Sequence, residues 1–156
     1  MRKFLSVTLL VILFFDATLL LAVDGKKAQY VGGTVSAIKE GSEGVLATKD
    51  ENKAVFTFKK TTWEVPYKDV TGLEYGQKAG RRVGVAIMIS PLALFSKKRK
   101  HFLTINFKDA QGKDQAVVFE LGKDIVRTTL TIFETRSGKQ IEYQDDEARK
   151  AGRGGD

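Results

Sequence analysis

The chain has no cysteine, a single histidine (His101) and two prolines in its 156 residues. The absence of cysteine excludes disulfides, thiolate metal sites, a cysteine nucleophile and a lipid attached to an N-terminal cysteine. The single histidine has no serine and acid placed in sequence to form a triad with it. We find no paired-carboxylate pattern and no phosphate-cradling glycine loop either. The sequence therefore predicts a protein that is not an enzyme and that holds no cofactor or metal ion.

Positive charge exceeds negative charge, with 26 Lys and Arg residues against 19 Asp and Glu residues and a formal net charge of +7. Such an excess favours anionic lipid headgroups, cell-wall polymers or acidic proteins as partners. Nucleic acid is a further class to weigh, because basic and aromatic residues adjoin one another in Lys97–Phe102. An export signal at the N-terminus counts against nucleic acid, and we expect none.

The N-terminus has the features of such a signal. The basic Met1–Lys3 precedes an apolar stretch, Phe4–Phe15. Cleavage after Ala22 would place Leu20 where a small residue is preferred, so the cleavage site is poor. The alternative is an uncleaved anchor that ends at Ala22 and contains Asp16, a costly residue in a membrane. With either outcome the rest of the chain is expected to be exported from the cytoplasm, as a periplasmic or secreted domain with or without attachment to the membrane.

Period-two alternation of apolar and polar residues recurs along the chain after this segment and predicts β-strands. Short connections rich in Gly, Asp and Lys separate the alternating segments and are typical of hairpin loops. Gly32-Gly33 lies inside the first segment and predicts a bulge or a bend. Pro66 is late in the fourth segment, which suits a strand end or a sheet edge. The seven expected strands are residues 29–38, 44–48, 54–59, 62–67, 71–76, 101–108 and 115–121.

The periodicity changes after the last of these strands. Gly122–Gly138 has four apolar residues on one helical stripe, namely Ile125, Val126, Leu130 and Phe133. We therefore expect an amphipathic helix that stops at Gly138, followed by an extended segment at residues 140–143. Residues 144–156 are charged and end in glycine and aspartate, and we expect them to be disordered.

Seven strands followed by one amphipathic helix is the order of the pleckstrin-homology-like barrel. Four stretches also resemble small exported bacterial domains of that kind, whose activity is unassigned: VPYKDVTGLEYGQ (65–77), KKRKHFLTINFKD (97–109), VVFELGKD (117–124) and TRSGKQIEYQDDEARKAG (135–152). The resemblance implies a mainly β fold, a seven-stranded antiparallel barrel or sandwich over residues 27–143, capped by the C-terminal helix. It does not extend to phosphoinositide binding. The loop 39–44 has one lysine and two glutamates, where phosphoinositide-binding members have basic residues.

An apolar run, Val83–Phe95, interrupts this order between the fifth and sixth strands and has basic flanks on both sides. It is too short for a helix that crosses a bilayer, and Pro91 argues against one long regular element. Three interpretations stay open: burial as an extra strand or cover, insertion into a membrane surface as a hairpin, or a protein interface. The residues expected to contact a membrane or partner are Ile87, Met88, Ile89, Leu92, Leu94, Phe95, Arg81, Arg82, Lys97, Lys98, Arg99 and Lys100.

These observations favour a non-enzymatic exported domain that works by binding. The expected partner is an anionic membrane surface, which the apolar run and its basic flanks would contact. The alternative is an assembly module that pairs with an envelope protein or with a second copy of the chain. Such a module would use the apolar run or an exposed strand edge.

Overall fold

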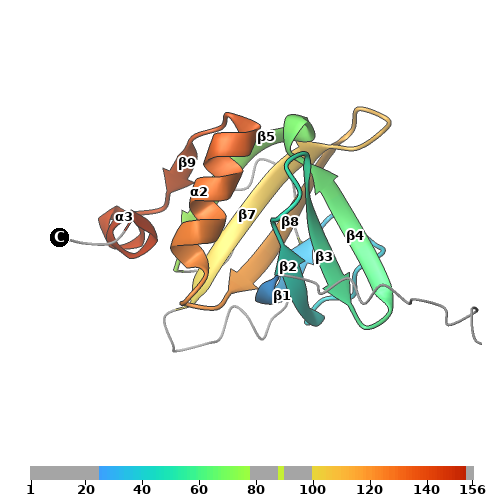
Figure 1. Cartoon of the computed structure of the whole chain (residues 1–156), viewed down its shortest axis with the longest axis horizontal. Helices are drawn as coiled ribbons and strands as arrows, with labels where there is room; N and C mark the ends of the chain where they lie inside the picture. The colour runs from blue at the N-terminus through green and yellow to red at the C-terminus, as the bar shows by residue number, and fades with distance from the viewer. Residues whose placement is uncertain (1–24, 78–87, 90–99, 154–156) are drawn as a thin grey trace, which may run out of the picture.

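Nine β-strands of the described chain form one sheet (Figure 1). The computed structural model describes residues 25–77, 88–89 and 100–153. A 3-10 helix, η1 (Tyr67–Asp69), joins the fourth strand to the fifth, and two helices follow the eighth strand, α2 (Val126–Ser137) and α3 (Asp146–Arg153). The strands are β1 (Lys26–Gly33), β2 (Glu43–Ala47), β3 (Lys53–Phe58), β4 (Thr61–Pro66), β5 (Val70–Gly76), β6 (Met88–Ile89), β7 (His101–Lys108), β8 (Asp114–Leu121) and β9 (Ile141–Tyr143).

The strand order is β4-β3-β2-β1-β8-β7-β5-β9, and β6 pairs with β1. The seven expected strands are confirmed as β1–β5, β7 and β8, and the expected extension at residues 140–143 is confirmed as β9. A mainly β fold with a C-terminal helix is confirmed as well. The expected closed antiparallel barrel is wrong, because the sheet is open and mixed. Closure would need the free side of β5, which the parallel strand β9 occupies.

The first strand ends at Gly33 rather than at Ile38. The register of β1 against β8 shifts between Tyr30 and Gly32, which confirms the expected bulge. Gly33 has φ of 151°, a value that favours glycine, and a Cβ there would lie 2.4 Å from the carbonyl oxygen of Ala116. Gly33 therefore allows the chain to turn away from the sheet at a position where a side chain would not fit.

The core lies between the inward face of the sheet and α2. The predicted stripe of α2 is confirmed, since Ile125, Val126, Leu130 and Phe133 are all at most 5% exposed and belong to the core cluster. Gly138 ends the helix in the left-handed conformation, with φ of 68° and its N–H donating to the Glu134 carbonyl at 3.0 Å. Figure 1 shows α2 lying across the strands of the sheet. The helix thus covers the inward side chains that period-two alternation brings together.

The outward face of the long strands is buried too. Neighbouring strands contribute six side chains that are at most 5% exposed and stand outside the core cluster, namely Val31, Glu74, Phe102, Thr104, Ala116 and Val118. Apart from Thr129, the buried side chains of α2 and α3 belong to the core cluster on the other face. Consequently, β7 and β8 are shielded from solvent on both faces. This explains why their sequences are more continuously apolar than those of β2–β4.

The expectation of a disordered tail is wrong for residues 146–153, which form α3. Asp145 caps this helix, because its Oδ1 accepts a hydrogen bond from the Ala148 N–H at 2.7 Å. Ala148 is fully buried, and Gly152 lies against Tyr143 and Leu130. Small residues one turn apart therefore let a highly charged helix pack closely on the domain. Residues 154–156 lie outside the described residues.

We expect Gly152→Val to detach α3 from the domain. A Cβ at this position would lie 2.7 Å from Cε1 of Tyr143 and 3.0 Å from Cδ1 of Leu130, so the larger side chain has no room. Amide hydrogen exchange over Asp146–Arg153 should become faster by about tenfold or more, while exchange in β7 and β8 stays slow. The matched variant Arg149→Ala, on the exposed side of the same helix, should leave exchange unchanged. Equal effects of both variants would contradict the packing.

We expect Phe133→Ala to lower the free energy of unfolding by about 3–5 kcal/mol, since the ring is fully buried between α2 and the sheet. Urea unfolding of the segment Val23–Asp156, which contains every described strand and helix, measures this change. Thr131→Ala, on the exposed face of α2, should change it by no more than about 0.5 kcal/mol. A small loss for Phe133→Ala would show that α2 does not close the core.

Candidate functional site

The segment that contains the apolar run leaves the sheet and returns to it at one place. β5 ends at Gly76 and β7 begins at His101, and Gly76 pairs with Phe102 across the two strands. The last residue of β8, Leu121, pairs with His101 at the same end of the sheet. The two strand ends that flank residues 78–99 therefore lie at this end of the sheet.

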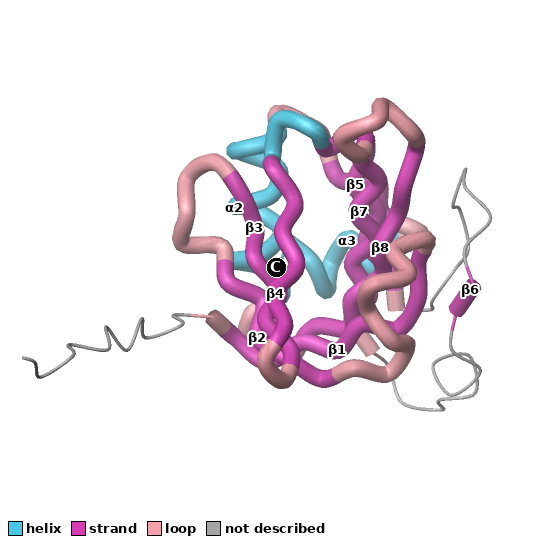
Figure 2. Tube along the Cα trace, turned by 90° about the vertical axis from the view of Figure 1, so that its right-hand side faces the viewer, coloured by secondary structure: helices cyan, strands magenta, loops and turns pink. Residues whose placement is uncertain are grey.

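Two of the predicted contact residues form a short strand. Met88 and Ile89 make up β6 and pair with Gly33 and Gly32 at the end of β1. Figure 2 shows β6 on the side of β8 that faces away from α2. This pairing agrees with the extra-strand interpretation for these two residues. Nine predicted contact residues lie outside the described residues, namely Ile87, Leu92, Leu94, Phe95, Arg81, Arg82, Lys97, Lys98 and Arg99.

Lys100 is the one predicted basic residue that the structure describes, and it is paired. Its Nζ lies 2.6 Å from Oε2 of Glu120 on β8, and the two side chains are 26% and 22% exposed. An ion pair so close to the surface contributes little to stability. It does hold the Lys100 side chain against β8, so this lysine is not free to bind a partner.

A hollow that the sequence did not predict lies at the start of β7, next to Lys100 in the chain. Its volume is about 490 Å³. β7 contributes its first residue, the turn before α2 and the first turn of that helix contribute four residues, and α3 contributes two. We call it the basic hollow, and its lining residues are His101, Lys123, Asp124, Arg127, Thr128, Lys150 and Ala151.

The basic hollow has an excess of unpaired positive charge. Lys123, Arg127 and Lys150 face a single carboxylate, that of Asp124. Within the described ranges, no hydrogen bond or ion pair engages any of these three cationic side chains. The first turn of α2 adds to the positive potential, because the helix begins without a side-chain cap and without an acidic residue in that turn.

His101 lines the basic hollow as a neutral ring. Burial lowers its pKa from the ordinary value of 6.5, and nearby Lys123 lowers it further, while Glu120 acts in the opposite direction. Nδ1 of the ring lies 2.5 Å from the hydroxyl of Tyr75. Burial raises the pKa of Tyr75 to about 12, so the phenol keeps its proton and holds Nδ1 of the ring by this hydrogen bond.

Two other hollows are less suited to an anion. One is lined by β1, β2 and β8 and brings Lys27 together with Glu43 and Glu120. The other lies between β2 and α2 and contains Arg136, whose guanidinium donates to the carbonyl oxygens of Thr48 and Asp50. Carboxylates or carbonyl oxygens offset positive charge in both. The basic hollow differs because its cations have no such partners.

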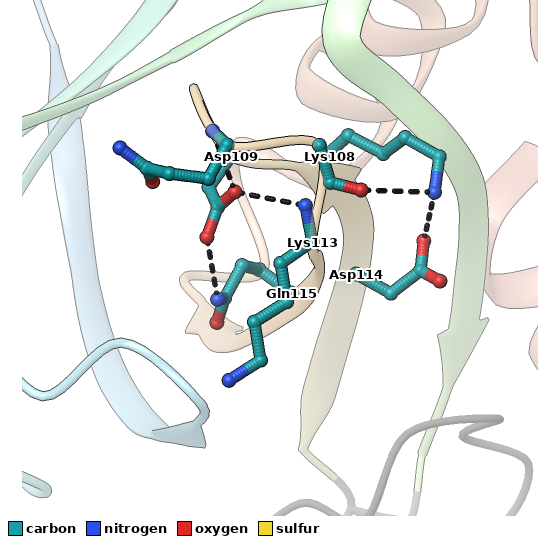
Figure 3. A network of polar contacts seen from close by, with 7 residues as sticks. Lys108, Asp109, Lys113, Asp114 and Gln115 are labelled. Atoms are coloured by element: carbon teal, nitrogen blue, oxygen red, sulfur yellow. Dashed lines mark hydrogen bonds and ion pairs between the residues drawn. The ribbon is translucent and has the colours of Figure 1, made fainter.

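The carboxylate of Asp109, in the hairpin between β7 and β8, has a structural role (Figure 3). Oδ1 of Asp109 accepts hydrogen bonds from the backbone N–H groups of Gln111 and Lys113 at 3.0 and 2.9 Å, and Oδ2 accepts one from Gln115 at 2.9 Å. The bond from the Lys113 backbone, followed by that from Gln115, lowers the pKa of Asp109. The carboxylate is therefore fully used in holding the turn.

No family model matches the chain, and no curated protein is similar to it. Among the described residues, none of the helices has the length and apolar character needed to span a bilayer. The function has to be argued from the geometry at this end of the sheet.

We expect Lys123→Gln to raise the pKa of His101, because the substitution removes a positive charge that disfavours the imidazolium. The pKa should stay below 6.5, since burial is the larger cause and remains. Nuclear magnetic resonance measures it directly, because the chain has one histidine. Lys113→Gln, in the β7–β8 hairpin, should have no effect. An unchanged pKa in Lys123→Gln would place that side chain away from the ring.

The same shift has a consequence for stability. The unfolded chain binds a proton at His101 more readily than the folded chain does, so the free energy of unfolding rises with pH across this range. The contribution is present above about pH 6.5 and is lost as the pH falls through the lower pKa of the folded protein. His101→Gln should remove this dependence in urea unfolding measured between pH 5 and pH 7.5, values chosen to bracket the ordinary histidine pKa of about 6.5.

Proposed function

We propose that this chain is a non-enzymatic, exported binding domain that attaches to an anionic membrane surface. The attachment uses the basic hollow for anionic headgroups and the apolar run for the acyl chains beneath them. One observation carries the proposal: Lys123, Arg127 and Lys150 gather in the basic hollow without a described partner. The apolar run supplies the second property that a membrane surface requires.

The fold supports a pleckstrin-homology-like assignment within this proposal. The first four strands form a meander. β1 also pairs with β8, and β7 and β5 follow β8 in the sheet. An amphipathic helix packs over the inward face of the sheet. This order agrees with the sequence resemblance. The open edge and the added strand β9 distinguish the chain from a closed barrel.

The proposal requires two contributions of comparable size. A Lys or Arg near an anionic membrane contributes about 1 kcal/mol, and salt screens that contribution. A large apolar side chain that is fully immersed contributes roughly 1.5–3 kcal/mol. The pairing of Met88 and Ile89 with β1 fixes part of the apolar run to the sheet. In this proposal the cations of the basic hollow supply the selectivity for anionic lipid.

An assembly module is the second candidate, and its two candidate surfaces are the edge strand β4 and the apolar run. Natural proteins protect such edges with proline and charge. β4 ends in Pro66, and its Glu64 makes an ion pair with Lys53 at 2.8 Å. These features limit pairing through this edge, which leaves the apolar run as the surface for a second copy or an envelope protein.

Flotation of Val23–Asp156 with liposomes tests the two candidates. We expect flotation with vesicles that contain anionic lipid, loss of flotation at high salt, and little flotation with neutral lipid. Changing Ile87, Ile89 and Leu94 to Ser should lower the bound fraction by about tenfold or more, because each loses an apolar contribution. Lys60→Gln/Lys113→Gln, which removes two positive charges away from the basic hollow, should float as the parent does.

A different set of results would contradict membrane attachment. A domain that stays in the heavy fractions under every lipid and salt condition, while gel filtration shows a concentration-dependent dimer, would replace membrane attachment with assembly. Circular dichroism of the triple variant confirms that any loss of flotation does not come from unfolding.

A further inference from the structure

The three cations of the basic hollow come from different segments and meet around one space. Lys123 and Arg127 lie four residues apart, on the turn before α2 and on its first turn, and Lys150 belongs to α3. His101, at the start of β7, adds the edge of a neutral imidazole. A guanidinium and two ammonium groups are all donors, and they suit one acceptor-rich anion.

We propose that the basic hollow binds a phosphate group, held by Arg127, Lys123 and Lys150. This inference deepens the proposed function and rests on it for a lipid headgroup as the source of the phosphate. The group itself is the shared chemistry of a headgroup and of free phosphate. Arg127 can donate two parallel hydrogen bonds to phosphate oxygens, and the lysines supply point charges.

The size of the basic hollow agrees with this ligand. Its volume of about 490 Å³ exceeds the needs of a single phosphate group and leaves room for an attached glycerol. Thr128 contributes a hydroxyl from the first turn of α2, and the small side chain of Ala151 on α3 takes up little of the space. The hollow therefore has room for a phosphate ester as well as for a bare phosphate ion.

Asp124 offers a substitution that should strengthen phosphate binding instead of weakening it. It is the one carboxylate that lines the hollow, and no described hydrogen bond or ion pair engages it. A bound phosphate has to lie near this like charge, which weakens the binding. Asp124→Asn should therefore tighten phosphate binding by about threefold to tenfold, as removal of a like charge near the surface does. Lys123→Gln/Arg127→Gln should weaken it by about tenfold or more.

His101 serves as the reporter. Lys123 and Glu120 are the charged groups that act on its ring, and Tyr75 holds Nδ1. A phosphate dianion in the hollow offsets the positive charge of Lys123 and favours the imidazolium. Binding should therefore raise the pKa of His101, and the single histidine makes the change visible without assignment of other residues.

The experiment follows His101 by nuclear magnetic resonance in the full chain, expressed and purified in an uncharged detergent. Inorganic phosphate is added at constant ionic strength, with chloride as the matched salt. We expect a saturable shift that Lys123→Gln/Arg127→Gln abolishes, that Asp124→Asn moves to lower phosphate concentration, and that Lys60→Gln/Lys113→Gln leaves unchanged. A response that is linear, or equal with chloride, or unaffected by Lys123→Gln/Arg127→Gln, overturns the inference.

A second arm distinguishes the sources of the phosphate. Glycerol 3-phosphate, the soluble headgroup of phosphatidic acid, replaces inorganic phosphate in the same titration. Tighter binding of glycerol 3-phosphate supports a lipid headgroup, and equal or weaker binding supports free phosphate. Saturable phosphate binding without liposome flotation would keep the phosphate site and overturn membrane attachment. Flotation without any response of His101 would keep membrane attachment and overturn the phosphate site.

Discussion

The packing of α2 against the inward face of the sheet is the constraint on which the other features depend. Phe133 and Leu130 lie over side chains from strands that are distant in the sequence, and they are fully buried or nearly so. Because the helix axis is fixed by this contact, its first turn is held beside the start of β7. Arg127 and Lys123 therefore meet His101 as a result of core packing, without any bond among them.

α3 completes the same arrangement from the other side. Its charged surface conceals two small residues, Ala148 and Gly152, that allow it to approach Tyr143 and Leu130 closely. Lys150 is placed at the basic hollow by this approach. The full set of three cations at this end of the sheet is thus a property of the assembled domain, because a fragment that lacked α3 would keep Lys123 and Arg127 and lose Lys150.

The strands and α2 could be predicted from the sequence because their signals are local: alternation places Leu103 and Ile105 on one face, and helical spacing joins Leu130 to Phe133. The charged composition of the tail predicts disorder, but residues 146–153 form α3. The helix depends on the cap from Asp145 and on the close contact of Gly152, which arise only in the tertiary structure. The basic hollow gave no sequence signal for the same reason, since its cations are 27 residues apart between Lys123 and Lys150. The open sheet edge depends on where β9 docks, which no local pattern specifies.

Because Gly76 pairs with Phe102, the segment between β5 and β7 can be exchanged for another segment that joins the same two strand ends. Its two attachment points are neighbours across a hydrogen-bonded pair of strands, so a short turn could join them as well as a long segment does. The entropy of closing a loop grows only slowly with its length, by about 0.6 kcal/mol for each doubling. Evolution can therefore lengthen, shorten or replace this segment at the cost of the two-residue strand β6 while the other eight strands keep their pairing, and related domains could acquire new targets by exchanging it alone.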